Sequence, residues 1–303
     1  MGRTLRVVNY AVNGSGAGHL MRLSAISRWL RRYGDYLGLR LEIYFLTSSE
    51  ADALLFHERF ASFKMPSKTV VGDAGIDKLA YLALAKQWVW HSLGLLRPDL
   101  LIVDTFPSGS FGELLSALDL CRCKVFVHRP VKDDFARRPD FQAMLPLYDL
   151  LVVPEHEALA PPVAPGLRRR TVFCGPVLAR ERVELLPRAA ARAALGLAAD
   201  ATVAYVSAGG GGDPGAERDL LAVRDALLTI PELHLVIGAG PLYRGRPLRG
   251  PRLTFLTEAG SAELMAAYDV AVCAAGYNTV NELLLAGVPA VLLPQPKVAD
   301  DQE

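Results

Sequence analysis

The chain has 303 residues, of which 51% are hydrophobic, so it is long enough to bury two globular cores. A formal net charge of +1 gives no reason to expect a nucleic-acid partner, and no apolar run reaches the length of a transmembrane helix. The N-terminus leads into a strand-like run without the apolar segment of a secretory signal, so we expect a soluble, cytoplasmic protein.

The chain contains four cysteines, and their spacing indicates neither a metal site nor a disulfide framework. Cys121 and Cys123 are separated by a single residue, whereas Cys174 and Cys273 lie in apolar, strand-like runs. We therefore expect reduced cysteines, as in other cytoplasmic proteins.

Apolar runs of strand length alternate with amphipathic helical runs along the chain. The first half is predicted to have strands at 5–12, 41–47, 100–104, 124–128, 149–154 and 170–175, and helices at 20–32, 76–95 and 110–118. The second half is predicted to have strands at 201–207, 233–237, 252–256, 269–275 and 290–294, helices at 186–195 and 216–228, and a helix that ends at 287. This alternation is typical of parallel, doubly wound α/β sheets.

Two Rossmann-like domains are predicted, 1–176 and 177–303, because a Gly-Pro turn at Gly175 and charged residues after it interrupt the apolar runs. The last strand of such a sheet is ordinarily covered by a helix, yet the sequence ends seven residues after Pro296. We expect the C-terminal domain to be incomplete within this sequence.

The segment that follows the strand at 269–275 has the groups that a diphosphate site requires. Gly276 permits close approach of a ligand to the backbone, and Asn278 or Thr279 is expected to cap the next helix. The N-terminus of that helix offers N–H groups and the positive end of its dipole to phosphate. Glu282, one turn further on, is placed to accept hydrogen bonds from a ribose diol.

Two polar residues follow the last predicted strand. Asp301 and Gln302 can accept from and donate to sugar hydroxyls, which apolar side chains cannot do. We therefore predict that they contact the sugar of a nucleotide-sugar donor.

A glycine-rich loop at 13–19 follows the first strand, at the edge where α/β sheets bind ligands. It is not the dinucleotide fingerprint, because its third glycine, Gly18, comes one position early and no acid ends the second strand. His19 is a candidate general base toward an acceptor hydroxyl, with Asp104 as its orienting partner. The alternatives are a histidine satisfied by backbone and a capping aspartate.

Three further features have both a functional and a structural interpretation. Arg22 is expected to meet a phosphate or an acceptor carboxylate, unless it is a solvated surface arginine. The glycines after Ser207 suit backbone contacts with donor phosphates, unless the loop is merely flexible. The run at 81–95, with Trp88 and Trp90, is either part of the core or a face for peripheral membrane contact.

These motifs resemble the GT-B glycosyltransferases, in particular family 28, the group that includes the lipid II N-acetylglucosaminyltransferase, and related bacterial predicted glycosyltransferases. The resemblance is specific in YDVAVCAAGYNTVNE at 268–282 and AGVP at 286–289, and it is loose at 35–170, where the acceptor would bind. It implies two domains facing across a cleft, ribose binding by Glu282, diphosphate binding by the turn at 275–279, and base binding near Leu256.

We predict transfer of a sugar from a nucleotide sugar, most often a UDP-sugar in this family, to an acceptor hydroxyl. We expect inversion and no metal ion, since the sequence has no Asp-x-Asp motif, and no cofactor beyond the nucleotide-sugar co-substrate. The alternatives are a nucleotide-sugar hydrolase or 2-epimerase of the same fold, and a non-catalytic nucleotide-binding module. The predicted catalytic residues are His19 and Asp104, and the predicted donor-binding residues are Gly16, Gly18, Arg22, Ser207, Gly209, Gly210, Leu256, Gly276, Tyr277, Asn278, Thr279, Glu282, Asp301 and Gln302.

Overall fold

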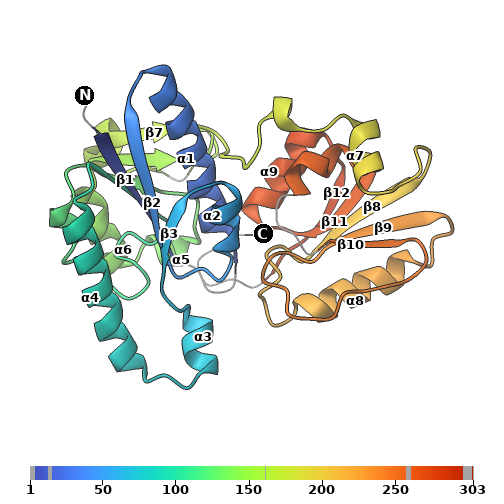
Figure 1. Cartoon of the computed structure of the whole chain (residues 1–303), viewed down its shortest axis with the longest axis horizontal. Helices are drawn as coiled ribbons and strands as arrows, with labels where there is room; N and C mark the ends of the chain where they lie inside the picture. Colours follow the sequence, from blue (N-terminus) through green and yellow to red (C-terminus); the bar gives the residue numbers. More distant parts are fainter. Residues whose placement is uncertain (1–3, 13–15, 161, 257–260, 296–301, 303) are drawn as a thin grey trace. The chain divides into compact units, whose positions relative to one another are not determined.

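The computed structural model describes residues 4–12, 16–160, 162–256, 261–295 and 302. The chain folds into two compact units, each built on one parallel sheet (Figure 1). Residues up to Val177 make up most of the first unit, and residues from Leu178 onward make up most of the second.

The first sheet has seven parallel strands in the order β3-β2-β1-β4-β5-β6-β7. Its strands are β1 (Thr4–Ala11), β2 (Arg40–Thr47), β3 (Ala61–Lys64), β4 (Leu100–Asp104), β5 (Lys124–Val127), β6 (Leu150–Val153) and β7 (Thr171–Phe173). The helices of this unit are α1 (Gly18–Tyr36), α2 (Ala53–His57), α3 (Lys68–Asp73), α4 (Lys78–Leu96), α5 (Asp133–Ala136) and α6 (Pro139–Met144), with 3₁₀ turns η1 (Leu118–Leu120), η2 (Leu145–Leu147) and η3 (Pro165–Arg170).

The second sheet has five parallel strands in the order β10-β9-β8-β11-β12. Its strands are β8 (Thr202–Ser207), β9 (Leu233–Gly238), β10 (Leu253–Leu256), β11 (Val270–Ala274) and β12 (Ala290–Leu293). The helices of this unit are α7 (Arg188–Ala194), α8 (Ala216–Leu227) and α9 (Tyr277–Ala286), with 3₁₀ turns η4 (Arg182–Glu184) and η5 (Ser261–Ala267).

Helices cover both faces of the second sheet (Figure 1). Leu220 of α8 packs with Val206 and Ile237 on one face, whereas Leu283 of α9 packs with Tyr205 on the other. β12 is an edge strand, and its burial pattern is exposed at all four positions.

Both sheets have a topological switch point, where the strand order reverses. In the first unit it lies between β1 and β4, and in the second between β8 and β11. Tyr10 pairs with Val103 at the first point and Ser207 with Cys273 at the second, so the loops that follow these strands begin side by side. Ligands of open α/β sheets bind in the crevice outside such strand ends, so each unit has one expected site.

The predicted parallel, doubly wound architecture is confirmed, but the helix predicted at 110–118 is wrong. That segment is a loop, in which Gly109 and Gly112 adopt positive φ values of 81° and 79°. The Glu113 carboxylate accepts hydrogen bonds from the N–H groups of Ser110 and Phe111, and these bonds replace the helical ones. The short elements β3, α2, α3, α5 and α6 were not predicted.

No helix in the described part of the chain combines the length and the apolarity that crossing a membrane requires. Trp88 packs against the core of the first unit, as one interpretation of the run at 81–95 expected. Trp90 of the same helix is 45% exposed.

Candidate functional site

His19 and Asp104 come together at the switch point of the first unit. Asp104 is the last residue of β4 and His19 the second residue of α1. His19 Nδ1 lies 2.9 Å from Asp104 Oδ2, and both side chains are buried. The His19 ring also stacks on Phe106, with 5.5 Å between the ring centroids and 6° between the planes.

The electrostatics of this pair favour a neutral imidazole beside an ionised carboxylate. Burial lowers the pKa of His19, although Asp104 opposes this effect. Burial opposes ionisation of Asp104, but Arg22 and His19 outweigh it, and the pKa of Asp104 falls to about 2. The 2.9 Å contact does not have the angle of a hydrogen bond. In the tautomer that carries its proton on Nδ1, toward Asp104, Nε2 has a lone pair that can accept a proton.

Arg22 does not lie on the surface but contacts Asp104, and its predicted contact with a phosphate stays a prediction. Its side chain is buried, and its NH1 donates to Asp104 Oδ1 at 2.9 Å and to Oδ2 at 2.7 Å. The sequence spacing placed Arg22 one turn from His19 but did not reveal that both would face Asp104.

The backbone after Asp104 is strained. Thr105 has a φ of 63°, a left-handed conformation that β-branched residues rarely adopt, and the Phe106 N–H bonds the Asp104 carbonyl at 2.7 Å. The Thr105 hydroxyl accepts from Arg129 Nε at 2.9 Å and donates to Asp104 Oδ2 at 3.3 Å. Strain of this kind persists only where the surroundings enforce it, and it gathers at functional sites.

The loop after Thr105 is held in place by hydrogen bonds to Glu113, a buried acid that the sequence did not identify as part of the site. Tyr10 donates from its hydroxyl to Glu113 Oε1 at 2.5 Å, and the Phe111 N–H donates to Oε2 at 2.6 Å. Burial raises the pKa of Tyr10, and the Glu113 carboxylate adds to that rise. Since Tyr10 lies on β1 and Glu113 follows β4, the two residues join the loop to the strand at the switch point.

The glycine loop of the second unit combines positive φ angles with hydrogen bonds to its backbone. Gly209 and Gly211 have positive φ values of 77° and 79°. The Ser207 hydroxyl accepts from the Gly209 N–H at 3.1 Å, and the Leu242 N–H donates to the Gly210 carbonyl at 3.0 Å. These bonds hold the loop at the carboxyl end of β8.

Helix α9 begins two or three residues earlier than its predicted caps, Asn278 and Thr279, would place it. Gly276 is the N-cap, with φ −74° and ψ 138°, and no side chain caps the helix. The prediction that Asn278 or Thr279 would cap it is wrong, because Tyr277 already has helical geometry. No capping side chain therefore takes up the N–H groups at the positive end of the helix dipole. An anion site requires these N–H groups to be available.

Glu282 lies in the second turn of α9. Its side chain is partly enclosed, and burial raises its pKa to about 7 although the Arg180 charge opposes the rise. Arg180 itself donates from Nε to Glu263 Oε1 at 2.6 Å. A glutamate with this pKa changes charge near neutral pH, so a hydrogen-bonding ligand would shift its ionisation.

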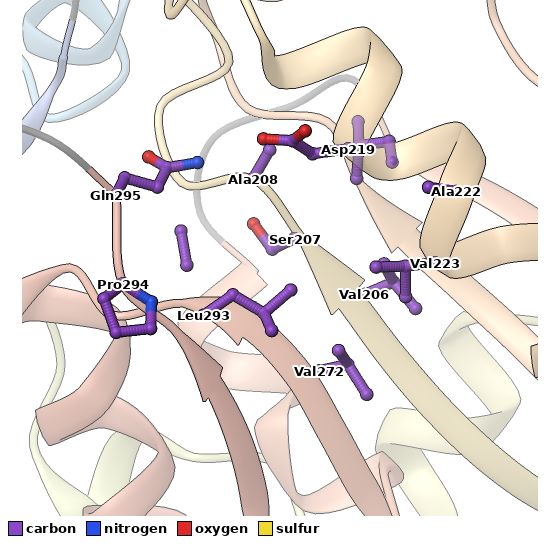
Figure 2. A pocket seen from close by; sticks show the side chains of 12 residues that line it. Val206, Ser207, Ala208, Asp219, Ala222, Val223, Val272, Leu293, Pro294 and Gln295 are labelled. Carbon is purple, nitrogen blue, oxygen red and sulfur yellow. The ribbon is translucent and has the colours of Figure 1, made fainter. Parts of the chain in front are cut away.

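A pocket of about 240 Å³ lies at the carboxyl ends of β8, β11 and β12, on the side of α8 (Figure 2). Val206, Val223 and Val272 form an apolar part, whereas Asp219 and Gln295 present polar atoms at the other end (Figure 2). Ser207 contributes its hydroxyl, which connects the pocket with the glycine loop.

The remaining predicted donor residues are less informative. Gly18 is the first residue of α1, and Gly16 precedes it. The Leu256 carbonyl accepts from the Ala239 N–H at 3.1 Å. The Gln302 side chain accepts from the Gln295 N–H at 2.9 Å, and Asp301 lies outside the described residues. Within the described ranges, no three His, Cys, Asp or Glu side chains cluster as a metal site would require.

The fold and these motifs match glycosyltransferases. Solved structures that the chain resembles include the glycosyltransferase SnogD from Streptomyces nogalater, at 15% identity and a TM-score of 0.60, with 96% of this chain and 82% of that chain covered. Another is a UDP-GlcNAc 2-epimerase from Methanocaldococcus jannaschii, at 11% identity and a TM-score of 0.57, with 95% and 84% covered. The fold is therefore GT-B, and at such identities these structures show the fold alone.

Sequence relatives give the class. Residues 253–303 match the glycosyltransferase family 28 C-terminal domain. A UDP-N-acetylglucosamine–N-acetylmuramyl-(pentapeptide) pyrophosphoryl-undecaprenol N-acetylglucosamine transferase of Symbiobacterium thermophilum is 27% identical over 320 residues, which cover 98% of this chain and 79% of that protein. The protein of the same name from Salinibacter ruber is 35% identical over 121 residues, which cover 38% of this chain and only 32% of that protein. These matches support a glycosyltransferase with a family 28 C-terminal domain.

Proposed function

We propose that the chain transfers a sugar from a UDP-sugar to an acceptor hydroxyl, with inversion and without a metal ion. The observation that carries this proposal is the buried pair of His19 and Asp104 at the switch point of the first unit, 2.9 Å apart. A neutral imidazole with one nitrogen held by a carboxylate is the arrangement of a general base.

In the proposed reaction, His19 Nε2 takes the proton of the acceptor hydroxyl while its oxygen forms a bond to the anomeric carbon of the donor. The bond from that carbon to the diphosphate breaks, and the nucleoside diphosphate leaves with the electron pair. Attack opposite to the leaving group inverts the anomeric centre. Asp104 stabilises the imidazolium that forms.

The second unit is proposed to bind the donor. The α9 N-terminus and the glycine loop after Ser207 offer backbone N–H groups and dipoles to the diphosphate, whose charge grows as it leaves. Glu282 is proposed to accept hydrogen bonds from the ribose hydroxyls. The choice of UDP is supported by the names of both relatives, which include UDP-N-acetylglucosamine.

Calorimetric titration with UDP, TDP and GDP tests the donor site without an acceptor. We expect selective binding of UDP and a loss of at least about tenfold in affinity for Glu282→Ala, since hydrogen bonds to charged groups contribute about 1.5–3 kcal/mol each. Glu217→Gln, an exposed acid on α8 of the same unit, is the matched control and should bind UDP like the wild type. An unchanged Kd in Glu282→Ala would remove the ribose assignment.

Turnover assays separate the proposed reaction from its alternatives. His19→Ala should lower transfer by about 10²–10⁴-fold while UDP binding persists. Consumption of the sugar nucleotide without an acceptor would instead indicate a hydrolase or a 2-epimerase, and the resemblance to a 2-epimerase structure makes this control necessary. Binding without any turnover would indicate a non-catalytic module.

The acceptor, the cytoplasmic location and peripheral membrane contact remain predictions. The exposed Trp90 on α4 is the feature that bears on membrane contact. Co-sedimentation of the wild type and Trp90→Ala with lipid vesicles tests it, because loss of an exposed aromatic should reduce binding to an interface.

A further inference from the structure

Asp104 is fully buried, and its charge lies beside the ring that is proposed as the base. His19 Nδ1 is 2.9 Å from Asp104 Oδ2. An aspartate at this distance, acting alone, favours the charged imidazolium. The imidazolium cannot accept a proton, so a base at neutral pH needs a feature that limits the attraction of Asp104.

Arg22 supplies a compensating charge at the same carboxylate. One nitrogen, NH1, contacts both carboxylate oxygens, at 2.9 and 2.7 Å, and the Arg22 side chain is only 2% exposed. Residues three apart on a helix share a face, and α1 therefore directs His19 and Arg22 to one acid.

A second cation is connected to the same acid through a hydroxyl. Arg129, which follows β5 and is buried, donates from Nε to Thr105 Oγ1, and this hydroxyl lies 3.3 Å from Asp104 Oδ2. The carboxylate is thus enclosed by one neutral ring, one direct arginine and one arginine that acts through Thr105.

We propose that Arg22, assisted by Arg129, is a positioning residue that neutralises Asp104, so that the carboxylate orients the His19 ring without charging it. This proposal rests on the assignment of His19 as the base.

The ionisable groups that act on His19 come from its own helix and from two neighbouring segments: Arg22 from α1, Asp104 from β4 and Arg129 from the segment after β5. Burial and the two arginines lower the pKa of His19, whereas Asp104 raises it. Loss of either arginine should therefore raise this pKa.

The test is a direct titration of the His19 ring by NMR in the nucleotide-free chain. The chain has six histidines, and the signal of His19 is assigned by its absence from His19→Gln. In Arg22→Gln we expect the His19 pKa to rise by about one unit, in the range that a nearby charge produces. The acid limb of the pH profile of kcat/KM should move upward by the same amount.

Two variants on α1 control this experiment. Arg22→Lys keeps a cation, and since one nitrogen makes both contacts, a single ammonium should keep the His19 pKa near its wild-type value. Arg28→Gln removes an arginine that pairs with Glu58, with 3.3 Å between Arg28 Nε and Glu58 Oε2, and it should leave the His19 pKa unchanged.

An unchanged His19 pKa in Arg22→Gln, or an equal rise in Arg28→Gln, overturns the proposal. If Arg22→Gln does not fold, Arg129→Gln decides, because it leaves the direct contact intact and the Arg129 charge also lowers the His19 pKa. A rise of the His19 pKa in that variant supports the proposal, and no rise overturns it. The titration needs neither donor nor acceptor, so it can be read separately from activity. If the wild type shows no sugar transfer but the His19 pKa rises in Arg22→Gln, only the proposed function fails. If the wild type transfers sugar but the His19 pKa does not change in Arg22→Gln, only the present inference fails.

Discussion

Glu282→Gln should stabilise the chain at pH 8 and have little effect at pH 5. Burial raises the pKa of Glu282 from 4.5 to about 7 in the folded state. A carboxyl with a raised folded pKa contributes stability that is fully present below the unfolded pKa and is lost as pH rises through the folded pKa. The glutamine, which stays neutral, does not lose that stability.

The magnitude follows from the shift. A difference of about 2.5 units corresponds to about 3 kcal/mol at pH 8, because each unit is worth 1.36 kcal/mol. At pH 5 little of the free energy that ionisation of Glu282 costs has yet been lost, so the expected stability difference between Glu282→Gln and the wild type is below about 1 kcal/mol. For a domain of roughly 120 residues, 3 kcal/mol raises the Tm by roughly 10 °C.

Scanning calorimetry at pH 5 and pH 8 is the assay. Tryptophan fluorescence does not report on the second unit, because Trp29, Trp88 and Trp90 all lie in the first. Glu217→Gln serves as the exposed control and should change stability by less than about 0.5 kcal/mol at both pH values. An equal gain for Glu282→Gln at the two pH values would refute the reasoning, since an uncharged effect of the amide would then explain it.

Three further predictions concern glycine geometry and metal dependence. Gly109→Ala should lower the free energy of unfolding by about 3 kcal/mol in urea titrations, because φ is 81° and a Cβ would collide with the Glu113 carboxylate; a change below 1 kcal/mol contradicts this. Gly211→Ala, whose Cβ would collide with the Ala239 carbonyl, should weaken UDP binding measured by calorimetry, and an unchanged Kd argues against a role of this loop. EDTA should leave transfer unchanged, and restoration of lost activity by Mg²⁺ would overturn the metal-independent mechanism.

The sequence predicted the fold well because its signals are local. Strands such as Leu100–Asp104 are continuous apolar runs that end in a polar residue, and the structure gives the same bounds. The short strand at Ala61–Lys64 was missed because its four residues are all exposed, and it has no apolar run to detect.

The candidate site was less predictable where it depends on distant partners. His19 and Asp104 could be paired in advance, because both lie at the carboxyl ends of strands, where α/β sheets bind ligands. The role of Glu113 depends on Tyr10, which lies 103 positions earlier, and no local pattern connects the two. The ion pair of Arg22 with Asp104 was not predicted, because spacing identifies the turn of a helix but not whether a charged side chain turns inward.

The exposed apolar side chains of β12 have a practical consequence for every assay above. Val291 is 55% exposed and Leu292 and Leu293 are each 39% exposed on an edge strand of the second sheet. Among the described residues no strand pairs with the outer side of β12, and an edge strand with apolar side chains favours pairing with a second chain and aggregation. Val291→Lys, with a charge at the edge, should keep the protein dispersed at calorimetric concentrations.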